Sequence, residues 1–228
     1  MIGVFDSGEG GENALAILRS HAPMLDIALF CDRENAPFGE KDERLLTTIT
    51  ERGIRRLISF GCESVLIACC TASTVYTRLS EDLRRRALPI IEPTAKEALR
   101  ITRRGKIAVI ATDTTAASHA FSSMLYGRCA AELAASPLVR AIEGGAADGD
   151  ISPALAEYLD GICKKISDTG ADVLILGCTH FVRLRGEITK RISKDAKTKI
   201  ITVDSAEAGA MEMLRRTEKS GSGVTVRI

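Results

Sequence analysis

Short runs of continuously apolar residues recur along the chain between longer amphipathic segments, and this alternation constrains the fold more than any other sequence feature. Runs that are apolar throughout, rather than at every second position, are typical of parallel strands with both faces buried. We therefore expect strands at Ile2–Phe5, Ile27–Cys31, Ser64–Ala68, Pro89–Ile91, Lys106–Ala111, Asp172–Leu176 and Lys199–Val203.

The segments between these runs have the periodicity of helices with one buried face. In Asp42–Phe60 the apolar side chains, Leu46, Ile49 and Leu57 among them, recur at steps of three and four residues, and Ser152–Ser167 repeats the pattern. Strands that alternate with such helices predict a doubly wound α/β fold with parallel sheets.

The chain also contains a weak internal repeat. Three pairs of segments are similar at offsets of 105, 108 and about 110 residues: Ile2–Ser7 with Ile107–Thr112, Val65–Thr71 with Val173–Thr179, and Ile90–Pro93 with Ile200–Asp204. Because the pairs follow one order at a nearly constant offset, we predict two similar α/β domains, the second beginning near Thr94 and related to the first by pseudo-two-fold symmetry.

Polar and reactive residues follow several of the predicted strands. They are Asp6-Ser7, Cys69-Cys70-Thr71, Thr112 and Cys178-Thr179-His180. Open parallel sheets bind their ligands beyond the carboxyl ends of their strands. We therefore expect an active site in a cleft between the two domains, with one cysteine cluster from each side.

Two opposed thiols suit the inversion of a carbon acid. A thiolate can remove a Cα proton while a thiol on the opposite face returns one, and oriented donors can replace a cofactor. We expect helices to begin near Thr71 and Phe181, and their N-termini to lower the pKa of the preceding thiols. Asp6 and His180 are candidates for tuning these thiols or relaying protons.

Other interpretations of these residues remain open at this level. Cys69, Cys70, Cys178 and His180 are suitable zinc ligands, although the paired Cys-x-x-Cys spacing of structural zinc sites is absent. The glycines of Gly8–Gly11 allow either a phosphate-binding turn or, as we favour, close packing of a helix on its strand. Buried packing is the expected role of the remaining cysteines, Cys31, Cys62, Cys129 and Cys163.

The composition narrows the class of protein. With 31 Lys and Arg against 30 Asp and Glu, the 228-residue chain has a net charge of +1, which gives no electrostatic basis for binding nucleic acid. We also expect no membrane span and no signal peptide, because no apolar run is long enough and none follows a basic N-terminal segment. The odd count of 7 cysteines favours a reducing compartment, so a cytoplasmic location is expected.

Seven segments in order along the chain resemble the motifs of glutamate racemases. They are Ile2-Gly-Val-Phe-Asp-Ser-Gly-Glu-Gly-Gly11, Asp32-Arg-Glu-Asn-Ala-Pro-Phe-Gly39, Ala68-Cys-Cys-Thr-Ala-Ser73, Ile91-Glu-Pro93, Pro137-Leu-Val-Arg-Ala-Ile-Glu143, Leu176-Gly-Cys-Thr-His-Phe181 and Val203-Asp-Ser205. The resemblance implies a cofactor-independent racemase that binds an amino acid between two α/β domains and supplies D-glutamate for peptidoglycan. It also implies a first domain of residues 1–93 plus 205–228 and a second of residues 94–204. We expect no metal and no membrane partner.

The resemblance assigns roles by matched position. It implies that Cys69 and Cys178 are the acid/base thiols and that Asp6 and His180 assist their proton transfers, with Asp32 and Glu143 as further assisting residues. The positions that match substrate contacts are Ser7, Pro37, Phe38, Gly39, Cys70, Thr71 and Thr179.

The chain departs from the family motifs at several of these positions. Cys70 replaces an Asn, Phe38 replaces a Tyr, Glu34-Asn35 stands where Ala-Arg is usual, and Phe181-Val182 replaces Tyr-Pro; the C-terminus is also short for the family. Missing hydrogen-bonding groups leave polar substrate atoms without partners. Two alternatives therefore remain: a related isomerase or lyase for aspartate, a hydantoin or a malonate-type acid, or an inactive paralogue that only binds an amino acid. A homodimer is one expected assembly, and the sequence leaves the oligomeric state open.

Overall fold

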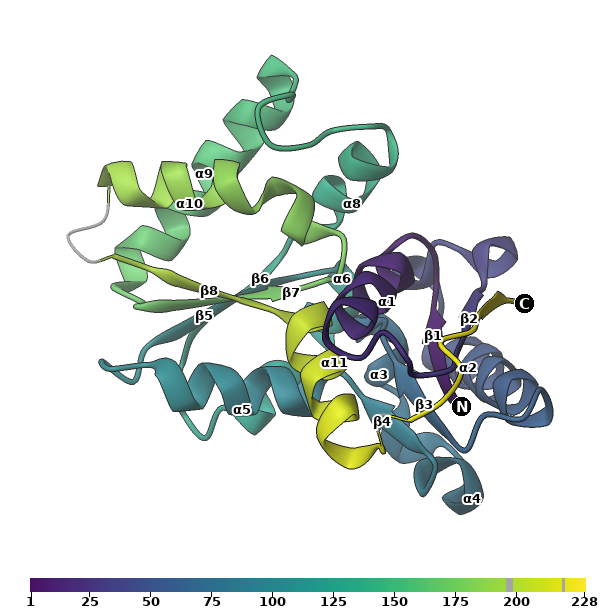
Figure 1. Ribbon diagram of the computed structural model, residues 1–228. Helices are drawn as coiled ribbons and strands as arrows, with labels where there is room; N and C mark the ends of the chain where they lie inside the picture. Colours follow the sequence, from purple (N-terminus) through teal and green to yellow (C-terminus); the bar gives the residue numbers. More distant parts are fainter. Residues whose placement is uncertain (196–198, 219) are drawn as a thin grey trace. The chain divides into compact units, whose positions relative to one another are not determined.

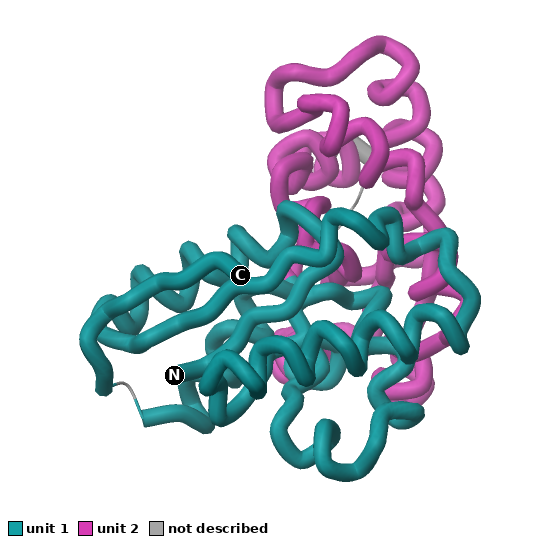
Figure 2. The backbone as a smooth tube through the Cα atoms, turned by 90° about the vertical axis from the view of Figure 1, so that its right-hand side faces the viewer, with its two compact units in different colours: residues 1–93, 205–228 teal, residues 94–204 magenta. Residues whose placement is uncertain are grey.

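The chain forms two compact units in a computed structural model that describes residues 1–195, 199–218 and 220–228 (Figure 2). Unit 1 comprises Met1–Pro93 and Ser205–Ile228, and unit 2 comprises Thr94–Asp204. The chain passes from unit 1 to unit 2 within helix α5 and returns to unit 1 between strand β8 and helix α11.

Unit 1 is built on a five-stranded parallel sheet in the order β4-β3-β1-β2-β9. Its strands are β1 (Ile2–Asp6), β2 (Ile27–Cys31), β3 (Ser64–Ile67), β4 (Ala87–Pro89) and β9 (Thr225–Arg227). Its α-helices are α1 (Gly10–His21), α2 (Glu43–Ser59), α3 (Cys70–Ser73), α4 (Glu81–Arg84), the start of α5 (Ile91–Ile101) and α11 (Ser205–Arg216). Three 3₁₀ turns, η1 (Arg33–Asn35), η2 (Phe38–Glu40) and η3 (Tyr76–Arg78), complete the unit.

Helices cover both faces of the unit 1 sheet. On one face, Val65 of β3 packs in a cluster with α2 residues such as Leu57. Its neighbour Leu66 points the opposite way and lies against Gly209 of α11, which in turn packs on α1. Because successive strand side chains alternate between faces, α2 and α11 lie on opposite sides of the sheet. This is the doubly wound arrangement that the alternating sequence predicts.

Unit 2 repeats this architecture on a four-stranded parallel sheet in the order β6-β5-β7-β8. Its strands are β5 (Ile107–Ala111), β6 (Cys129–Ala134), β7 (Val173–Gly177) and β8 (Ile201–Asp204). Its helices are α6 (Asp113–Ala117), α7 (Ala120–Met124), α8 (Ser136–Glu143), α9 (Pro153–Thr169) and α10 (Arg185–Asp195), with a 3₁₀ turn η4 (Phe181–Leu184). Helices α9 and α10 lie on one side of this sheet and α5 lies on the other (Figure 1).

The two units share one strand order, which confirms the predicted internal similarity. The order β4-β3-β1-β2 of unit 1 corresponds to β8-β7-β5-β6 of unit 2, and the first two repeated segments fall on the matching strands β1 with β5 and β3 with β7. The third pair is wrong in detail. Ile201–Asp204 forms β8, whereas Ile91 already begins a helix.

The predicted strand Pro89–Ile91 is therefore displaced from the observed β4, Ala87–Pro89. Proline has no N–H for a further ladder bond, and the next amide, that of Ile90, donates to the Ser73 hydroxyl at 3.1 Å instead. Ile90 and Ile91 are buried although they do not pair in the sheet, and Ile91 is the first residue of helix α5. Continuous apolar character alone cannot separate these two cases.

Two edge strands, β6 and β9, were not expected from the sequence. Cys129–Ala134 is rich in alanine and contains Glu132, so it has little of the apolar signal of a central strand. Thr225–Arg227 is short, but the β-branched residues of Val224-Thr-Val-Arg-Ile228 are the signal that could have identified it. Within the described parts of the chain, none of the helices is both long enough and apolar enough to cross a membrane.

Replacing Gly53 with alanine should destabilise the protein, because helix α2 packs directly on a buried aromatic ring there. An added Cβ would lie 2.3 Å from Cε2 of Phe5, so we expect a loss of about 1–3 kcal/mol in the free energy of unfolding. Gly161→Ala in α9 is the matched control, since its Cβ would meet nothing within 4 Å and should stabilise the helix by up to about 1 kcal/mol. Urea unfolding of both variants measures the difference, and equal stabilities would contradict the predicted packing.

Candidate functional site

Three adjacent strands of unit 1 end at the same edge of the sheet and bring three predicted site residues there. Asp6 is the last residue of β1, Asp32 follows β2, and Cys69 follows β3 by two positions. Backbone hydrogen bonds extend the pairing past the strand ends, from the Asp32 N–H to the Asp6 carbonyl (2.9 Å) and from the Ala68 N–H to the Phe5 carbonyl (2.7 Å). The parallel register therefore places these side chains together.

Cys69 is the N-cap of the short helix α3. Its sulfur accepts the Ala72 N–H at 3.5 Å and lies 3.5 Å from the Ser7 hydroxyl oxygen, within hydrogen-bonding distance for sulfur. The side chain is 6 % exposed, so the thiol is held in a fixed orientation with little access to water.

The pKa of the Cys69 thiol is raised to about 11. Burial is the main cause, because a thiolate loses its hydration there, and the negative charge of Asp6 adds to it. The hydrogen bonds from Ala72, Ser7 and Thr71 act in the opposite direction but do not balance these two effects. The expected lowering of this pKa by the helix N-terminus is thus wrong in its net direction for Cys69.

Asp6 is fully buried next to the turn that starts α1. The Gly8 N–H donates to Asp6 Oδ1 at 2.7 Å. A Cβ on Gly11 would lie 2.8 Å from the Cβ of Asp6 and 3.2 Å from the Cys31 sulfur. For Gly11, this close approach confirms the expected tight packing of the helix on its strand, whereas a Cβ on Gly8 would meet nothing within 4 Å.

Asp32 begins the segment that contains the predicted substrate-binding residues Pro37 to Gly39. Its carboxylate is 4 % exposed; it accepts two hydrogen bonds from the Asn35 amide nitrogen, to Oδ1 at 2.8 Å and to Oδ2 at 2.9 Å. Arg52 of α2, a residue that the sequence does not single out, lies 3.7 Å from Oδ2.

The predicted substrate contacts on this segment differ in exposure. Pro37 follows a cis peptide bond and is exposed, while Gly39 is half-buried. The Phe38 side chain is 2 % exposed and packs 6.1 Å from the Phe5 ring centroid. Its ring is thus part of the core of unit 1.

Unit 2 carries a second cysteine at the corresponding strand end. Cys178 follows β7 and its sulfur lies 3.6 Å from His180 Nδ1. On the other side of the imidazole, Nε2 lies 3.7 Å from Oε1 of Glu143, the last residue of α8. Cys178 and His180 are 8 % and 5 % exposed, whereas the Glu143 side chain is 43 % exposed. A chain of polar groups therefore connects the buried thiol to a half-exposed carboxylate.

The loop after Glu143 is hydrogen-bonded to the segment that follows His180. Asp148 accepts the N–H groups of Gly186 and Glu187, both at 2.9 Å, and its own N–H donates to the Arg183 carbonyl at 2.8 Å. A Cβ at position 186 would lie 2.6 Å from Asp148 Oδ2, so glycine is needed for this contact. These contacts attach the loop that follows α8 to the start of α10.

The remaining predicted contact residues are buried near the strand ends. Ser7 is half-buried, and Cys70, Thr71 and Thr179 are 2 %, 3 % and 2 % exposed. Among the cysteines assigned to packing, Cys62 and Cys163 are buried, and Cys31 and Cys129 are half-buried.

The four residues named as possible zinc ligands are divided between the two units, with Cys69 and Cys70 in unit 1 and Cys178 and His180 in unit 2. In residues 1–195, 199–218 and 220–228, no group of three or more His, Cys, Asp or Glu side chains is arranged to hold a metal ion.

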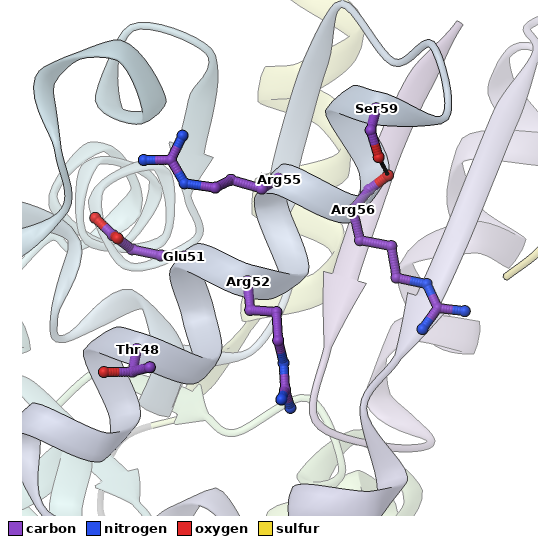
Figure 3. Close-up of a pocket in the computed structure, with 6 residues that line it drawn as sticks. All are labelled: Thr48, Glu51, Arg52, Arg55, Arg56 and Ser59. Atoms are coloured by element: carbon purple, nitrogen blue, oxygen red, sulfur yellow. Dashed lines mark hydrogen bonds between the residues drawn. The ribbon is translucent and has the colours of Figure 1, made fainter.

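A hollow of about 570 Å³ on unit 1 lies along the outer surface of α2, lined by Thr48, Glu51, Arg52, Arg55, Arg56 and Ser59. Its three guanidinium groups point away from one another (Figure 3). Arg55 donates to Asp82 and Ser80 at 3.1 and 3.0 Å, and Arg56 lies 4.5 Å above the Phe30 ring. The arginines therefore do not converge on one ligand.

Family and sequence comparisons find similarity to known racemases along nearly the whole chain. The family model for Asp/Glu/Hydantoin racemase matches residues 24–213. A glutamate racemase of Desulforudis audaxviator is 34% identical, and the match covers 94% of this chain and 80% of the relative. One from Aquifex aeolicus is 32% identical, with coverages of 97% and 85%.

Solved structures show the same similarity. The crystal structure of glutamate racemase from Thermus thermophilus in complex with β-chloro-D-alanine superimposes with a TM-score of 0.81 at 29% identity. The superposition covers 99% of this chain and 86% of that one. This chain therefore shares its α/β fold with that structure.

Asp6→Asn should make Cys69 reactive at lower pH, because it removes a negative charge that raises the pKa of this thiol. We expect the inflection in the pH profile of Cys69 alkylation by iodoacetamide, followed by site-resolved mass spectrometry, to move down from about 11. Cys129 is the internal control: burial and Glu132, not Asp6, raise its pKa to about 11, so its profile should not move. Equal shifts at both cysteines would indicate general loosening of the fold and contradict the electrostatic explanation.

Proposed function

Because this chain belongs to the Asp/Glu/Hydantoin racemase family, we propose that it interconverts L- and D-glutamate without a cofactor. The observation that carries the proposal is a buried cysteine after the matching strand of each unit, β3 and β7, in a chain that resembles glutamate racemases over most of its length. Inversion by proton transfer across the two faces of a carbon acid uses one group that removes a proton and a second that returns one, and two thiols meet that need.

In the proposed reaction, one of Cys69 and Cys178 starts as a thiolate and the other as a thiol. The thiolate removes the proton from Cα, and the thiol donates its proton to the opposite face. The configuration inverts, and the two sulfurs have exchanged protonation states, so atoms and charge balance. The reverse reaction uses the same groups in the opposite roles, which requires both sulfurs to reach Cα.

Asp6 and Ser7 adjust Cys69 in this proposal. A thiol whose pKa is about 11 is rarely ionised at neutral pH, but its thiolate is a strong base. The ammonium group of a bound amino acid would favour the thiolate, because it compensates the negative charge that Asp6 contributes. The Ser7 hydroxyl, 3.5 Å from the sulfur, would stabilise the same anion.

His180 and Glu143 have the corresponding role for Cys178. An imidazole 3.6 Å from the sulfur can take or return its proton, and a carboxylate 3.7 Å from the other ring nitrogen favours the imidazolium that results. In this proposal, Cys178 therefore exchanges its proton with the help of an imidazole, whereas Cys69 is adjusted by a carboxylate and a hydroxyl group.

Substrate recognition in this proposal involves Ser7, Thr71, Thr179, Cys70 and the backbone of Pro37, Phe38 and Gly39. Cys70 is the main departure from the family motif, because a thiol is a weaker hydrogen-bonding group than the amide of Asn. Glutamate remains our proposed substrate, and aspartate is the comparison that the test below includes.

We also infer a cytoplasmic role in supplying D-glutamate for peptidoglycan. All seven cysteines are free thiols, the state that a reducing compartment maintains. The role itself follows from the proposed substrate and not from any contact in the structure.

Incubation with L-glutamate in D₂O should introduce deuterium at Cα and produce D-glutamate. The deuterium comes from the donating thiol, which exchanges with solvent. Mass spectrometry and chiral chromatography measure the two products. Deuterium exchange with L-aspartate but not with L-glutamate would show that aspartate is the substrate. If neither amino acid exchanges but glutamate stabilises the protein against heat, the chain is an inactive binding protein.

Cys69→Ser should lower kcat for glutamate by roughly 10²–10⁴-fold, because a serine hydroxyl is too weak a base for Cα. Cys70→Ser is the matched control and should lower kcat by about tenfold at most, since Cys70 contributes only to binding. If Cys70→Ser is the more damaging change, the assignment of the acid/base thiol to position 69 is wrong.

Glu143→Gln should lower kcat by about three- to tenfold, because the neutral amide no longer stabilises a protonated His180 at 3.7 Å. Glu157→Gln, an exposed position on α9, is the control and should leave kcat unchanged. Steady-state racemisation assays measure both. An unchanged kcat in Glu143→Gln would remove Glu143 from the proposed relay.

A further inference from the structure

The Asp32 carboxylate is held by two different elements of unit 1. Both of its oxygens accept from the Asn35 amide nitrogen, at 2.8 and 2.9 Å, and Arg52 of α2 lies 3.7 Å from Oδ2. The carboxylate is 4 % exposed, whereas the Arg52 side chain is 64 % exposed. Asn35 therefore makes the close contacts, and Arg52 adds a weaker electrostatic one from the solvent side.

We propose that Asn35 is a positioning residue that anchors Asp32 and thereby fixes the substrate-binding segment Pro37–Gly39. This inference rests on the proposed racemase function. It gives Asp32 the role of an anchor in place of proton transfer, because both of its oxygens accept hydrogen bonds from the Asn35 NH2 group, which cannot take up or release a proton at neutral pH.

Backbone hydrogen bonds connect Asp32 to the substrate-binding segment Pro37–Gly39. The Asp32 N–H is fixed to the Asp6 carbonyl at 2.9 Å, so one end of the segment is attached to β1. The η1 turn then closes through the Asn35 N–H to the Asp32 carbonyl and the Ala36 N–H to the Arg33 carbonyl, both at 3.3 Å. These two backbone contacts are long, so the two side-chain hydrogen bonds of Asn35 are the stronger restraint on the turn.

The segment fixed in this way lies against the Cys69 region. Phe38 and Cys69 belong to one buried cluster, and the η2 turn contacts helix α3. A displacement of Asp32 would therefore move Pro37 and Gly39 relative to the thiol. Because these positions are proposed to bind substrate and not to transfer protons, the loss should appear mainly in substrate affinity.

Asn35 is also one of the positions where the chain departs from the family motif, which has an arginine there. A short amide next to a buried carboxylate provides two donors without a second buried charge, and Arg52 supplies the positive charge from the neighbouring helix.

Exchanging the side chains of Asp32 and Asn35 tests whether Asp32 is an anchor or a group that transfers protons. Asn35→Asp places two carboxylates side by side, Asp32→Asn places two amides there, and the double variant Asp32→Asn/Asn35→Asp restores one carboxylate and one amide in reversed positions. We expect each single variant to raise KM for glutamate about tenfold with kcat changed by about threefold at most. The double variant should recover KM to within about threefold of the unchanged protein.

Two kinetic results would overturn the proposal. If Asp32→Asn and the double variant both lose kcat by about 10²-fold or more at unchanged KM, Asp32 transfers protons. If Asn35→Asp changes neither constant, Asn35 has no positioning role. Arg55→Gln is the control on α2, since Arg55 pairs with Asp82 and not with Asp32, and it should change neither constant.

Hydrogen exchange keeps this test independent of the proposed function. Amide exchange in the peptide that covers residues 33–41 should be faster in Asn35→Asp than in the unchanged protein and should slow again in the double variant. This result is expected even if glutamate is not the substrate, so a failed racemase assay and a failed anchor are distinguishable. Unchanged exchange in Asn35→Asp would overturn the anchor whatever the enzyme assay shows.

Discussion

The parallel direction of every strand in both sheets is the constraint on which the candidate site depends. Parallel strands all end at one edge of their sheet, so residues far apart in sequence become neighbours if each follows a strand. In unit 1 this constraint gathers Asp6, Asp32 and Cys69 after β1, β2 and β3. In unit 2 it places Cys178 after β7, which corresponds to β3.

Burial at these strand ends has a cost that the local donors only partly offset. The Cys69 thiolate is disfavoured by lost hydration and by Asp6, and three hydrogen bonds favour it without prevailing. A fully buried Asp6 is itself tolerated because the turn of α1 supplies an N–H at 2.7 Å, which the close approach of Gly11 permits. The same packing that stabilises unit 1 therefore makes its thiol a weak acid.

The two units share a strand order but surround their cysteines differently. Cys69 has a hydroxyl at 3.5 Å and a carboxylate that opposes its ionisation, whereas Cys178 has an imidazole at 3.6 Å. The two cysteines therefore have different electrostatic surroundings although their units share a strand order. In a reaction that exchanges protons between two groups, such an asymmetry would assign each direction of turnover a different proton-handling partner.

The sequence by itself determined the α/β class, the central strands and the two similar halves, because buried parallel strands and amphipathic helices leave distinct periodic patterns. It also identified Cys69 and Cys178 as strand-end residues. It could not find β6 and β9, since edge strands bury too little to need an apolar run, and it misplaced β4 because Ile91 is buried in a helix.

Only the tertiary structure decided which side chains share an environment. The contact of Arg52 with Asp32 joins α2 to the end of β2, and no spacing in the sequence encodes it. The direction of the Cys69 pKa shift was also out of reach, because the sequence indicates a helix N-terminus but not the burial that outweighs it. Periodicity records which face of an element is buried, whereas solvation and charge depend on which neighbours the folded chain brings within a few ångströms.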